Sequence, residues 1–401
     1  MRICLVSQEY PPATSSGGIG TQAHAKAHGL ARRGHEVCVI SASMDHRRHE
    51  YSDGPVLTVR IPGYRDRMPL FSMPVKWLTY SAEVAAEISE LHARTPLDLV
   101  EFAEYGAEGY IHLLNRTEWN YIPTVIHLHG PLVMFAHTMG WPEVESEFYR
   151  IGTMMEEKCL RLANGVYSSS GCSADWCAEH YGIAREHIPV LHVGVDAELF
   201  APRDVPKNSR PTIIFVGLIS RNKGAELLLD AACVLAAEFP DLQLRMLGHG
   251  DAKTVAILQH KALAAGLPEL LDCPGYVTRQ ELSTQLCRAH VFAAPSVYEG
   301  GPSFVCLEAM ACGLPVIASK GSGVAEVITD GRDGILVPPQ DRDSLARALS
   351  QLLSDQARRL EIGARARARV LAEASREACL DKIEALYAGV AVCHREVGPV
   401  V

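Results

Sequence analysis

The sequence predicts an α/β protein made of two doubly wound halves that face each other across a deep cleft. Three observations point to this fold class. Short β-branched runs alternate with longer helical patterns along almost the whole chain, as in parallel sheets covered by helices on both faces. The length of 401 residues suits two or three domains. A proline-rich polar stretch, Ala201–Pro211, divides the alternation and predicts a linker.

The first half is expected to carry parallel strands joined by helical crossovers. Arg2–Ser7 predicts a strand, and Gln22–Arg33 predicts a helix that Gly34 ends. Further strands are expected at Glu36–Ser41, Val56–Ile61, Leu97–Glu101, Thr124–His127, Gly165–Ser169 and Ile188–His192, and further helices at Val75–Ala93 and Phe148–Ala163.

The alternation restarts after the linker. Strands are expected at Thr212–Val216, Gln243–Leu247, Val291–Ala294, Pro315–Ala318 and Ile335–Val337, and helices at Ala225–Ala237, Asp343–Ser354 and Ala372–Tyr387. We expect one domain over residues 1–200, a second over 201–375, and a C-terminal helix within 376–401 that crosses back to the first domain before a tail. Ligands bind outside the carboxyl ends of strands in such sheets, so the cleft is the expected site.

Composition argues against several classes of protein. The net charge of −9 does not suit a basic nucleic-acid surface, and 48% hydrophobic residues do not suit a disordered chain. Gln8 and Glu9 interrupt the N-terminal apolar run too early for a signal peptide, and no apolar run reaches the roughly 18 residues of a membrane helix. The 12 cysteines are scattered without a C-x-x-C pair, which predicts reduced thiols and a cytoplasmic protein.

A glycine-containing loop, Ser15–Gly20, separates the first expected strand from the first expected helix. Glycines at this place let backbone N–H groups approach a phosphate at the helix N-terminus. The stretch Gly18–Ala23 also fits the G-x-G-x-x-A dinucleotide fingerprint, but Gln8–Ser16 separate it from the strand. A plain turn into the helix is the structural alternative.

The matching loop of the second half, Gly217–Gly224, carries Arg221 and Lys223 just before an apolar helix. The helix dipole disfavours cations at this end, and a bound anion would resolve the conflict. A solvated loop with two charges is the alternative.

Segment 295–318 joins a strand, a Gly-Gly-Pro turn, a short helix and a second strand. Glu308 has apolar neighbours on that helix, so its carboxylate needs hydrogen-bond partners. The paired hydroxyls of a sugar or ribose suit a carboxylate. A carboxylate that caps the amides of the turn is the alternative.

Two histidines end a strand of the first half. His127 and His129 face the same side of that strand. Zinc would need a third ligand, which the neighbouring sequence does not supply. Hydrogen-bonded structural residues and functional residues at the cleft remain the two interpretations.

Together these segments resemble the retaining nucleotide-sugar glycosyltransferases of family 4, which have the GT-B fold of two Rossmann-like domains. The resemblance covers nearly the whole chain. It runs from the Gly17-Gly18 loop through Val190–Asp196 and Lys223-Gly224 to the most specific segment, Glu308–Val316.

The resemblance implies a role for each matching residue. The amides of Gly17 and Gly18 and the ammonium of Lys223 would bind the donor's diphosphate. Glu308 would hold the ribose hydroxyls, Glu299 the transferred sugar, and His129 would lie near the anomeric carbon. The remaining donor-site positions would be Gly248, Tyr276 and Val277 near the base, and the amides of Ser303, Phe304 and Val305 near sugar and phosphate. His129, Lys223 and Glu299 are the expected catalytic residues.

This sequence departs from the family pattern at three places. Leu218 stands where the family usually has arginine, and Arg221 is our candidate substitute. Glu299 and Glu308 are nine residues apart rather than eight. His192-Val193 replaces the usual Pro-Asn.

The resemblance implies transfer of a sugar from a UDP- or GDP-sugar to an acceptor hydroxyl, with the leaving phosphate helping to deprotonate the acceptor. No cofactor and no metal ion are expected. Glu101, Glu104 and His129 are candidates for acceptor binding, with ordinary loop charges as the alternative for the two glutamates. Segment Arg60–Trp77 suggests an acceptor flap, and the negative net charge makes a peripheral membrane contact there the less favoured reading. The sequence does not indicate the oligomeric state.

Other functions share some of these features. A GT-B sugar-nucleotide epimerase or phosphorylase would share the diphosphate loops. Gly18-Ile19-Gly20 and Asp45 suggest a nicotinamide-dependent oxidoreductase, against which the long Gln8–Ser16 insertion speaks. A non-catalytic sugar-nucleotide sensor would bind the donor without turnover.

Overall fold

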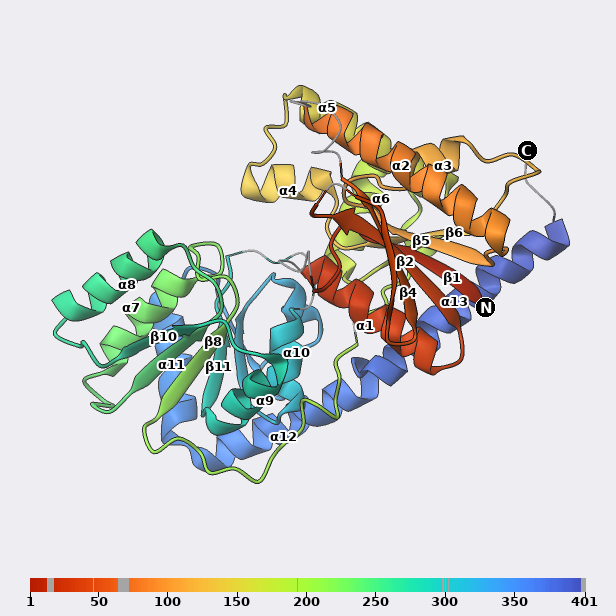
Figure 1. Cartoon of the computed structure of the whole chain (residues 1–401). Helices are drawn as coiled ribbons and strands as arrows, with labels where there is room; N and C mark the ends of the chain where they lie inside the picture. Colours follow the sequence, from red (N-terminus) through yellow and green to blue (C-terminus); the bar gives the residue numbers. More distant parts are fainter. Residues whose placement is uncertain are drawn as a thin grey trace. The chain divides into compact units, whose positions relative to one another are not determined.

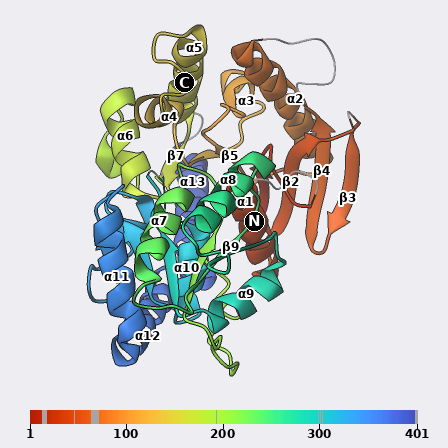
Figure 2. The same cartoon turned by 90° about the vertical axis from the view of Figure 1, so that its left-hand side faces the viewer.

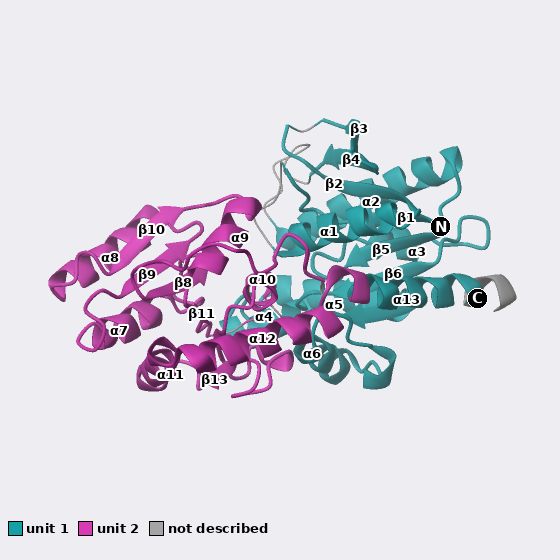
Figure 3. Ribbon diagram, turned by 90° about the horizontal axis from the view of Figure 1, so that it is seen from below, with its two compact units in different colours: residues 1–192, 379–401 teal, residues 193–378 magenta. Residues whose placement is uncertain are grey.

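The computed structural model describes residues 1–12, 18–45, 47–63, 72–192, 194–297, 299, 301 and 303–397, with backbone only for 393–397. The chain divides into two compact units (Figure 3). Unit 1 consists of Met1–His192 with Cys379–Val401, and unit 2 consists of Val193–Ala378. Each unit has its own twisted, mostly parallel sheet with helices on both faces, so the predicted fold class is confirmed.

Unit 1 is built on a seven-stranded sheet in the order β3-β4-β2-β1-β5-β6-β7 (Figure 1). All neighbouring strands are parallel except β3 and β4. Its strands are β1 Arg2–Val6, β2 Glu36–Ser43, β3 His49–Asp53, β4 Val56–Pro62, β5 Leu99–Ala103, β6 Thr124–Leu128 and β7 Gly165–Ser168. Its helices are α1 Gly18–Arg32, α2 Met73–Arg94, α3 Tyr110–Leu114, α4 Leu132–Met139, α5 Glu147–Leu162, α6 Gly171–Tyr181, the 3₁₀ turn Arg185–His187 and most of α13 Arg376–Val397.

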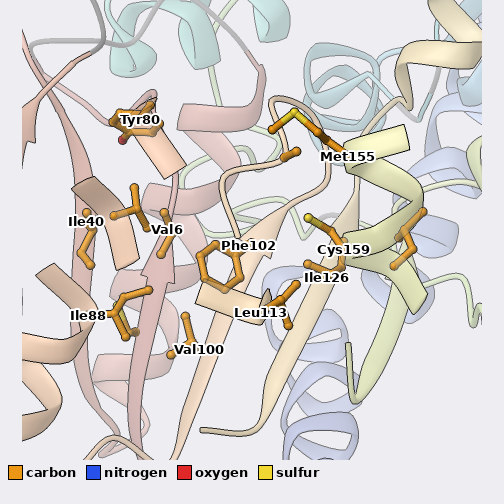
Figure 4. Packing of buried hydrophobic residues seen from close by; sticks show 14 of the residues in the cluster. Val6, Ile40, Tyr80, Ile88, Val100, Phe102, Leu113, Ile126, Met155 and Cys159 are labelled. Atoms are coloured by element: carbon orange, nitrogen blue, oxygen red, sulfur yellow. The ribbon is translucent and has the colours of Figure 1, made fainter. Parts of the chain in front are cut away.

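Two apolar layers cover the sheet of unit 1. The strands are apolar on both faces, as expected for parallel strands buried between helices. On one face, Phe102 of β5 packs with Tyr80 of α2, Leu113 of α3 and Met155 of α5 (Figure 4). The other face is covered by α1 and α13, whose apolar residues share a core with β1 and β2. The chain's last helix is therefore part of the core of the first unit.

Unit 2 is built on a six-stranded parallel sheet in the order β10-β9-β8-β11-β12-β13. Its strands are β8 Thr212–Val216, β9 Gln243–Leu247, β10 Leu271–Gly275, β11 Val291–Ala294, β12 Val316–Ser319 and β13 Ile335–Val337. Its helices are α7 Ala225–Leu235, α8 Ala252–Ala264, α9 Arg279–Arg288, α10 Phe304–Ala311, the 3₁₀ turn Gly323–Glu326, α11 Arg342–Ser354 and α12 Gln356–Glu373. On one face α7 lies beside α11 (Figure 2). On the other, α9, α10 and α12 share a core.

Both sheets have the same strand order once β3 is set aside. Counted along each unit, the order is 3-2-1-4-5-6, the doubly wound arrangement in which ligands bind where the order reverses. In unit 1 this switch point lies between β1 and β5. In unit 2 it lies between β8 and β11. The loops at the carboxyl ends of these four strands are therefore the places to look for a site.

Two expected strands differ from the structure. The strand expected at Leu97–Glu101 begins and ends two residues later, because the carboxylate of Asp98 accepts the Arg2 amide and pairing with β1 starts at Leu99. The strand expected at Ile188–His192 is wrong: only a single bridge joins Val190 to Ser168. Pro189 has no N–H to continue the ladder there.

The single helix expected at Ala372–Tyr387 is also wrong. The structure ends α12 at Glu373 and starts α13 at Arg376, and the break pairs Ser375 with Val195. Val195 N–H donates to the Ala374 carbonyl at 2.9 Å, and Arg376 N–H donates to Val195 O at 2.8 Å. Because the Ala374 carbonyl and the Arg376 amide bond to Val195, they are not available for the hydrogen bonds of a continuous helix. Along the chain, the boundaries between the units fall between His192 and Val193 and between Ala378 and Cys379. The sequence suggested boundaries between residues 200 and 201 and between residues 375 and 376.

Within the described part of the chain, no helix combines the length and the apolar composition that crossing a membrane requires. Of the segment Arg60–Trp77, in which the sequence suggested an acceptor flap or a membrane contact, residues 64–71 lie outside the described residues.

Candidate functional site

The switch point of unit 2 brings two predicted residues together. Lys223, on the loop after β8, forms an ion pair with Glu299, on the loop after β11. The Glu299 carboxylate is largely buried and accepts a second hydrogen bond, of 3.2 Å, from the hydroxyl of Ser296. The side chain of Lys223 is about one-third exposed. The longer spacing between Glu299 and Glu308 therefore does not keep Glu299 away from this lysine.

The two loops that carry this pair are fixed to each other by their backbones. The amide of Val297 donates to the carbonyl of Asn222 at 2.7 Å. Gly224 has a φ of +74°, and a Cβ there would lie 2.2 Å from the Pro295 carbonyl oxygen. Only glycine allows this approach. The pair is therefore held by close-packed loops and not by two free side chains.

Glu308 lies on α10 and is 0% exposed. Its Oε1 accepts a 2.6 Å hydrogen bond from the guanidinium of Arg279, the first residue of α9. Its Oε2 is buried and has no hydrogen-bond partner among the described residues. Burial raises the pKa of Glu308 to about 7, although the Arg279 charge opposes the rise. Such an oxygen favours hydrogen-bond donors from a ligand, because buried polar atoms are rarely left unpaired.

Three charged groups of this edge act on one residue of α10. The buried thiol of Cys306 has a raised pKa, caused first by its burial. The charges of Glu299 and Glu308 raise this pKa further, and the charge of Lys223 lowers it. The first amides of that helix, at Phe304 and Val305, follow Ser303, which makes no side-chain cap.

Glycines also bring the loops after β8 and β9 close together. Gly248 has a φ of +129°, and a Cβ there would lie 2.2 Å from the carbonyl oxygen of Gly217. Its amide donates to the Gly275 carbonyl at 2.9 Å. Next to it, His249 and Tyr276 stack with ring centroids 5.3 Å apart, and Tyr276 is 66% exposed. Val277 is partly buried and packs against the core.

We expect Gly248→Ala to lower the free energy of unfolding by about 3 kcal/mol, because the alanine would have a strained positive φ and its Cβ would also clash with the Gly217 carbonyl. Gly275→Ala is the matched control: its φ is also positive, at +89°, but a Cβ there meets nothing within 4 Å. Strain alone should cost about 1–2 kcal/mol. Urea unfolding of both variants measures the difference, and equal losses would contradict the close approach of these two loops.

Arg221 and Leu218 lie on the same loop as Lys223. Both are exposed, and the Arg221 carbonyl accepts the amide of Gly224 at 3.0 Å. The structure thus gives this loop a second cation, Arg221, three residues after the leucine. In unit 1, Gly18 is the first residue of α1, and Gly17 lies outside the described residues.

His129 and Glu104 lie together at the carboxyl edge of the unit 1 sheet. The Glu104 carboxylate accepts the amides of His129, at 2.7 Å, and of Gly130. Glu104 is fully buried, and burial raises its pKa to about 7. Burial, with the Lys26 charge second, lowers the pKa of His129 to about 3, so its imidazole is neutral at physiological pH. Within the described part of the chain, the Nδ1 of His129 and the Oε2 of Glu104 have no hydrogen-bond partner.

Glu101 lies inside β5 and not after it. It forms an ion pair with Lys26 of α1 and accepts a hydrogen bond of 2.8 Å from the Tyr167 hydroxyl. The hydroxyl of Tyr387, on α13, donates to the same carboxylate. Glu101 is therefore a structural carboxylate that joins helices to the sheet, which corrects the expectation that it faces an acceptor.

Glu108 is a buried carboxylate that the sequence did not single out. It follows β5, and its Oε1 accepts the Gln8 amide at 2.9 Å across the switch point. Burial raises its pKa to about 8, and the charges of Glu9 and Glu104 raise it further. The folded protein therefore holds a proton on Glu108 that the unfolded chain loses near pH 4.5.

We expect the free energy of unfolding to fall as pH rises from about 5 to about 8, because over that range the unfolded chain has released the proton that the folded protein still holds on Glu108. Glu108→Gln should remove roughly 3 kcal/mol of this fall, at about 1.4 kcal/mol per pKa unit. Urea unfolding at several pH values measures the slope. Glu145→Gln, at a carboxylate 90% exposed, is the control and should keep the wild-type slope. An unchanged slope in Glu108→Gln would contradict the assignment.

Arg279 is the other functional residue that sequence reasoning missed. A buried glutamate signals that some cation is needed, but the partner comes from a helix start 29 residues earlier.

Among the described residues, one group of three side chains has the spacing of a metal site. It consists of His24, His28 and Asp53 and lies outside the loops discussed above.

Comparison with known proteins places these loops in context. A family model described as Glycosyltransferase Family 4 matches residues 16–199, and one described as Glycosyl transferases group 1 matches residues 198–369. The chain is 30% identical over 376 residues to a D-inositol 3-phosphate glycosyltransferase of Paenarthrobacter aurescens, covering 88% of this chain and 89% of that protein. It is 27% identical over 389 residues to a glycogen synthase of Mycobacterium tuberculosis, covering 89% and 87%.

Solved structures with the same fold include a sucrose-phosphate synthase from Thermosynechococcus elongatus. It has a TM-score of 0.80 and 23% identity, and the match covers 98% of this chain and 99% of that one. HepE of Anabaena, solved in complex with UDP-glucose, has a TM-score of 0.73 and 19% identity, with 97% and 100% covered. At these identities the likeness concerns the fold.

Proposed function

The chain belongs to the group 1 and family 4 glycosyltransferases and has the GT-B fold, and from this we propose that it transfers a sugar from a nucleoside-diphosphate sugar to an acceptor hydroxyl with retention of configuration. One observation carries the proposal. At the switch point of unit 2, the loop after β11 carries Glu299, which pairs with Lys223, and leads into α10, where the buried Oε2 of Glu308 has no hydrogen-bond partner among the described residues.

The leaving diphosphate accounts for the cations at this edge. Breaking the bond between sugar and phosphate leaves negative charge on the diphosphate and positive charge on the sugar ring. Lys223, Arg221 and the first amides of α10 are placed to stabilise the negative charge, which is electrostatic preorganisation. In unit 1 the amide of Gly18, the first residue of α1, takes the same role. The resemblance implies this role for Gly17 as well, which lies outside the described residues. The leaving phosphate itself helps to remove the acceptor proton.

The carboxylates of Glu308 and Glu299 bind the uncharged parts of the donor, which are its ribose and the transferred sugar. Glu308 accepts hydrogen bonds from the two ribose hydroxyls, with Arg279 holding its other oxygen. Glu299 accepts from hydroxyls of the transferred sugar. Tyr276 and Val277 lie with Gly248 near the base. In unit 1, neutral His129 offers Nδ1 to a sugar hydroxyl, and Glu104 holds the His129 backbone.

We propose that transfer needs no metal ion, because the cations and amides named above already neutralise the diphosphate. A transfer rate unchanged in excess EDTA supports this. A rate lost in EDTA and restored by Mg²⁺ or Mn²⁺ contradicts it. The acceptor is proposed only as a class, a hydroxyl compound, and the protein as cytoplasmic.

Donor screening tests the function first. Because HepE of Anabaena was solved with UDP-glucose, UDP-sugars come first, followed by GDP- and ADP-sugars. A ligand at 100 times its Kd stabilises the native state by about 2.7 kcal/mol, so the matching donor should raise the Tm by several degrees. No shift with any nucleotide sugar would contradict the donor site.

Product analysis separates the competing functions. Free nucleoside diphosphate with a new glycoside of unchanged anomeric configuration supports transfer. An epimerised sugar nucleotide, or cleavage that depends on inorganic phosphate, supports the related GT-B reactions instead. Oxidation of NADH would indicate an oxidoreductase, and donor binding without turnover would indicate a sensor.

We predict that Arg221→Ala weakens donor binding about 10-fold, which corresponds to one charge-assisted hydrogen bond to phosphate. Arg332→Ala is the matched control, because Arg332 is an exposed arginine of the same unit that lies before β13. Titration calorimetry with the donor measures both. Equal donor affinities in the two variants would leave the idea that Arg221 replaces the family arginine without support.

A further inference from the structure

A group of potential metal ligands lies on the outer strands of unit 1, outside the proposed donor site. His24 and His28 lie one turn apart on the same face of α1. Asp53 ends the exposed edge strand β3, and its Oδ2 lies 3.5 Å from His24 Nε2 and 3.0 Å from His28 Nε2. The three ligand atoms all lie within 4.8 Å of one another.

These separations match the edges of a small tetrahedron. Zinc bonds of about 2.0–2.2 Å place neighbouring ligand atoms about 3.3–3.6 Å apart in a tetrahedral site. The two distances from Asp53 lie close to this range. Two imidazole nitrogens gathered at one carboxylate oxygen supply the nitrogen–oxygen ligand set that a shared zinc-class ion accepts, although the same oxygen can also accept hydrogen bonds from both rings.

The surroundings fix the carboxylate and leave one side open. The buried hydroxyl of Tyr10 donates to Asp53 Oδ2 at 3.3 Å, as outer-shell groups do for metal ligands. Gly54, with a φ of +58°, turns the chain directly after Asp53 and so fixes its position beside α1. The side chain of His24 is 39% exposed, which gives an ion access from solvent and leaves room for a water ligand.

We propose that His24, His28 and Asp53 bind one zinc-class divalent ion, with water as the fourth ligand. Two imidazoles and one carboxylate suit Zn²⁺ and its first-row neighbours, whereas Mg²⁺ and Ca²⁺ prefer oxygen ligands. The ion joins α1, which begins at the Gly18 loop, to the β3–β4 hairpin at the edge of the sheet. The site lies apart from the residues that we assign to the donor and does not depend on sugar transfer being the function.

Zinc binding to the full-length, tag-free protein tests the proposal. After treatment with a chelator, the protein is titrated with Zn²⁺ in competition with a chromophoric chelator. We expect one ion per chain, a higher Tm with Zn²⁺, and binding weakened more than about 100-fold in Asp53→Asn and in His28→Ala. Loss of even an outer-shell partner typically costs 10–100-fold. His24→Gln, at the most exposed ligand, is a further variant that should fold normally and also lose binding.

His180→Ala is the matched control, since it removes an exposed histidine of α6 in the same unit, and should bind Zn²⁺ as the wild type does. Co²⁺ substitution identifies the ligands, because a tetrahedral nitrogen–oxygen site gives visible ligand-field bands without a thiolate charge-transfer band. Absence of binding at micromolar Zn²⁺ would overturn the proposal. So would a thiolate spectrum, or unchanged binding in folded Asp53→Asn and His24→Gln.

Discussion

Replacing Lys223 with alanine is expected to lower the rate of transfer by about 100- to 1,000-fold, while the protein stays folded. Lys223 is the cation of the loop after β8 that pairs with Glu299, and backbone contacts with the loop after β11 hold that loop in place. A fixed ammonium stabilises the departing diphosphate more than the bound donor, because the charge grows as the bond breaks. Single-turnover rates at saturating donor measure this effect.

A double variant separates two roles of Lys223. Its ammonium neutralises the Glu299 carboxylate, whose side chain is only 8% exposed, so Lys223→Ala leaves a buried charge unpaired. If neutralising Glu299 were its whole role, Lys223→Ala/Glu299→Gln would regain activity. We expect the double variant to stay as slow as Lys223→Ala. Recovery to within about tenfold of Glu299→Gln alone would contradict a role at the diphosphate.

Lys253→Ala supplies the control for general effects of charge. Lys253 is an exposed lysine of α8 in the same unit, and its loss should leave the rate unchanged. Circular dichroism and urea unfolding confirm that each variant is folded. A similar loss of rate in Lys253→Ala would mean that net charge, and not the position of Lys223, matters.

The alternation of strands and helices could be predicted because each buried parallel strand is an apolar run between turn signals. The strand β3 could not, because His49–Asp53 is an edge strand whose side chains are mostly exposed and polar. The break between α12 and α13 was missed for a different reason. It depends on backbone bonds from Ala374 and Arg376 to Val195, about 180 residues away in the chain.

Residues of the site could be predicted from the sequence only where the pattern that marks them lies within one short segment. Lys223 and Glu308 each stand in a local pattern of glycines and apolar residues that marks a strand, a turn and a helix. The pairing of Glu308 with Arg279 depends instead on how α9 and α10 pack, which no local pattern encodes. Glu101 was expected at the carboxyl end of its strand because the strand was placed two residues too early, whereas the structure has it buried in the middle of β5.

Replacing Glu308 is expected to reduce donor affinity by at least about 100-fold and to leave the fold intact. Each hydrogen bond to a charged group is worth about 1.5–3 kcal/mol, and the carboxylate would lose two ribose hydroxyls. Glu308→Ala also leaves Arg279 without its partner, so Glu308→Gln, which keeps the side-chain volume, is measured beside it. Titration calorimetry with a nucleoside-diphosphate sugar gives the affinities.

A deoxyribose donor analogue shows whether the lost contact is the ribose. The wild type should bind the 2′-deoxy or 3′-deoxy donor more weakly than the parent donor. Glu308→Ala and Glu308→Gln should bind the analogue and the parent donor about equally, because the discriminating oxygen is gone. Wild-type discrimination retained in both variants would place the ribose elsewhere.

The pH dependence of binding provides a second, independent readout for Glu308. Burial raises the pKa of this carboxyl to about 7 in the free protein, so near pH 6 it is mostly protonated. Ribose hydroxyls donate to the charged form, and binding therefore favours loss of that proton. Affinity for the nucleotide sugar should rise as pH increases from about 6 to about 8, by up to tenfold per pH unit below the pKa. Because the diphosphate of a nucleotide sugar has no proton to lose in this range, Glu308→Gln should show a flat profile, and a rise equal to that of the wild type would exclude Glu308 as the titrating group.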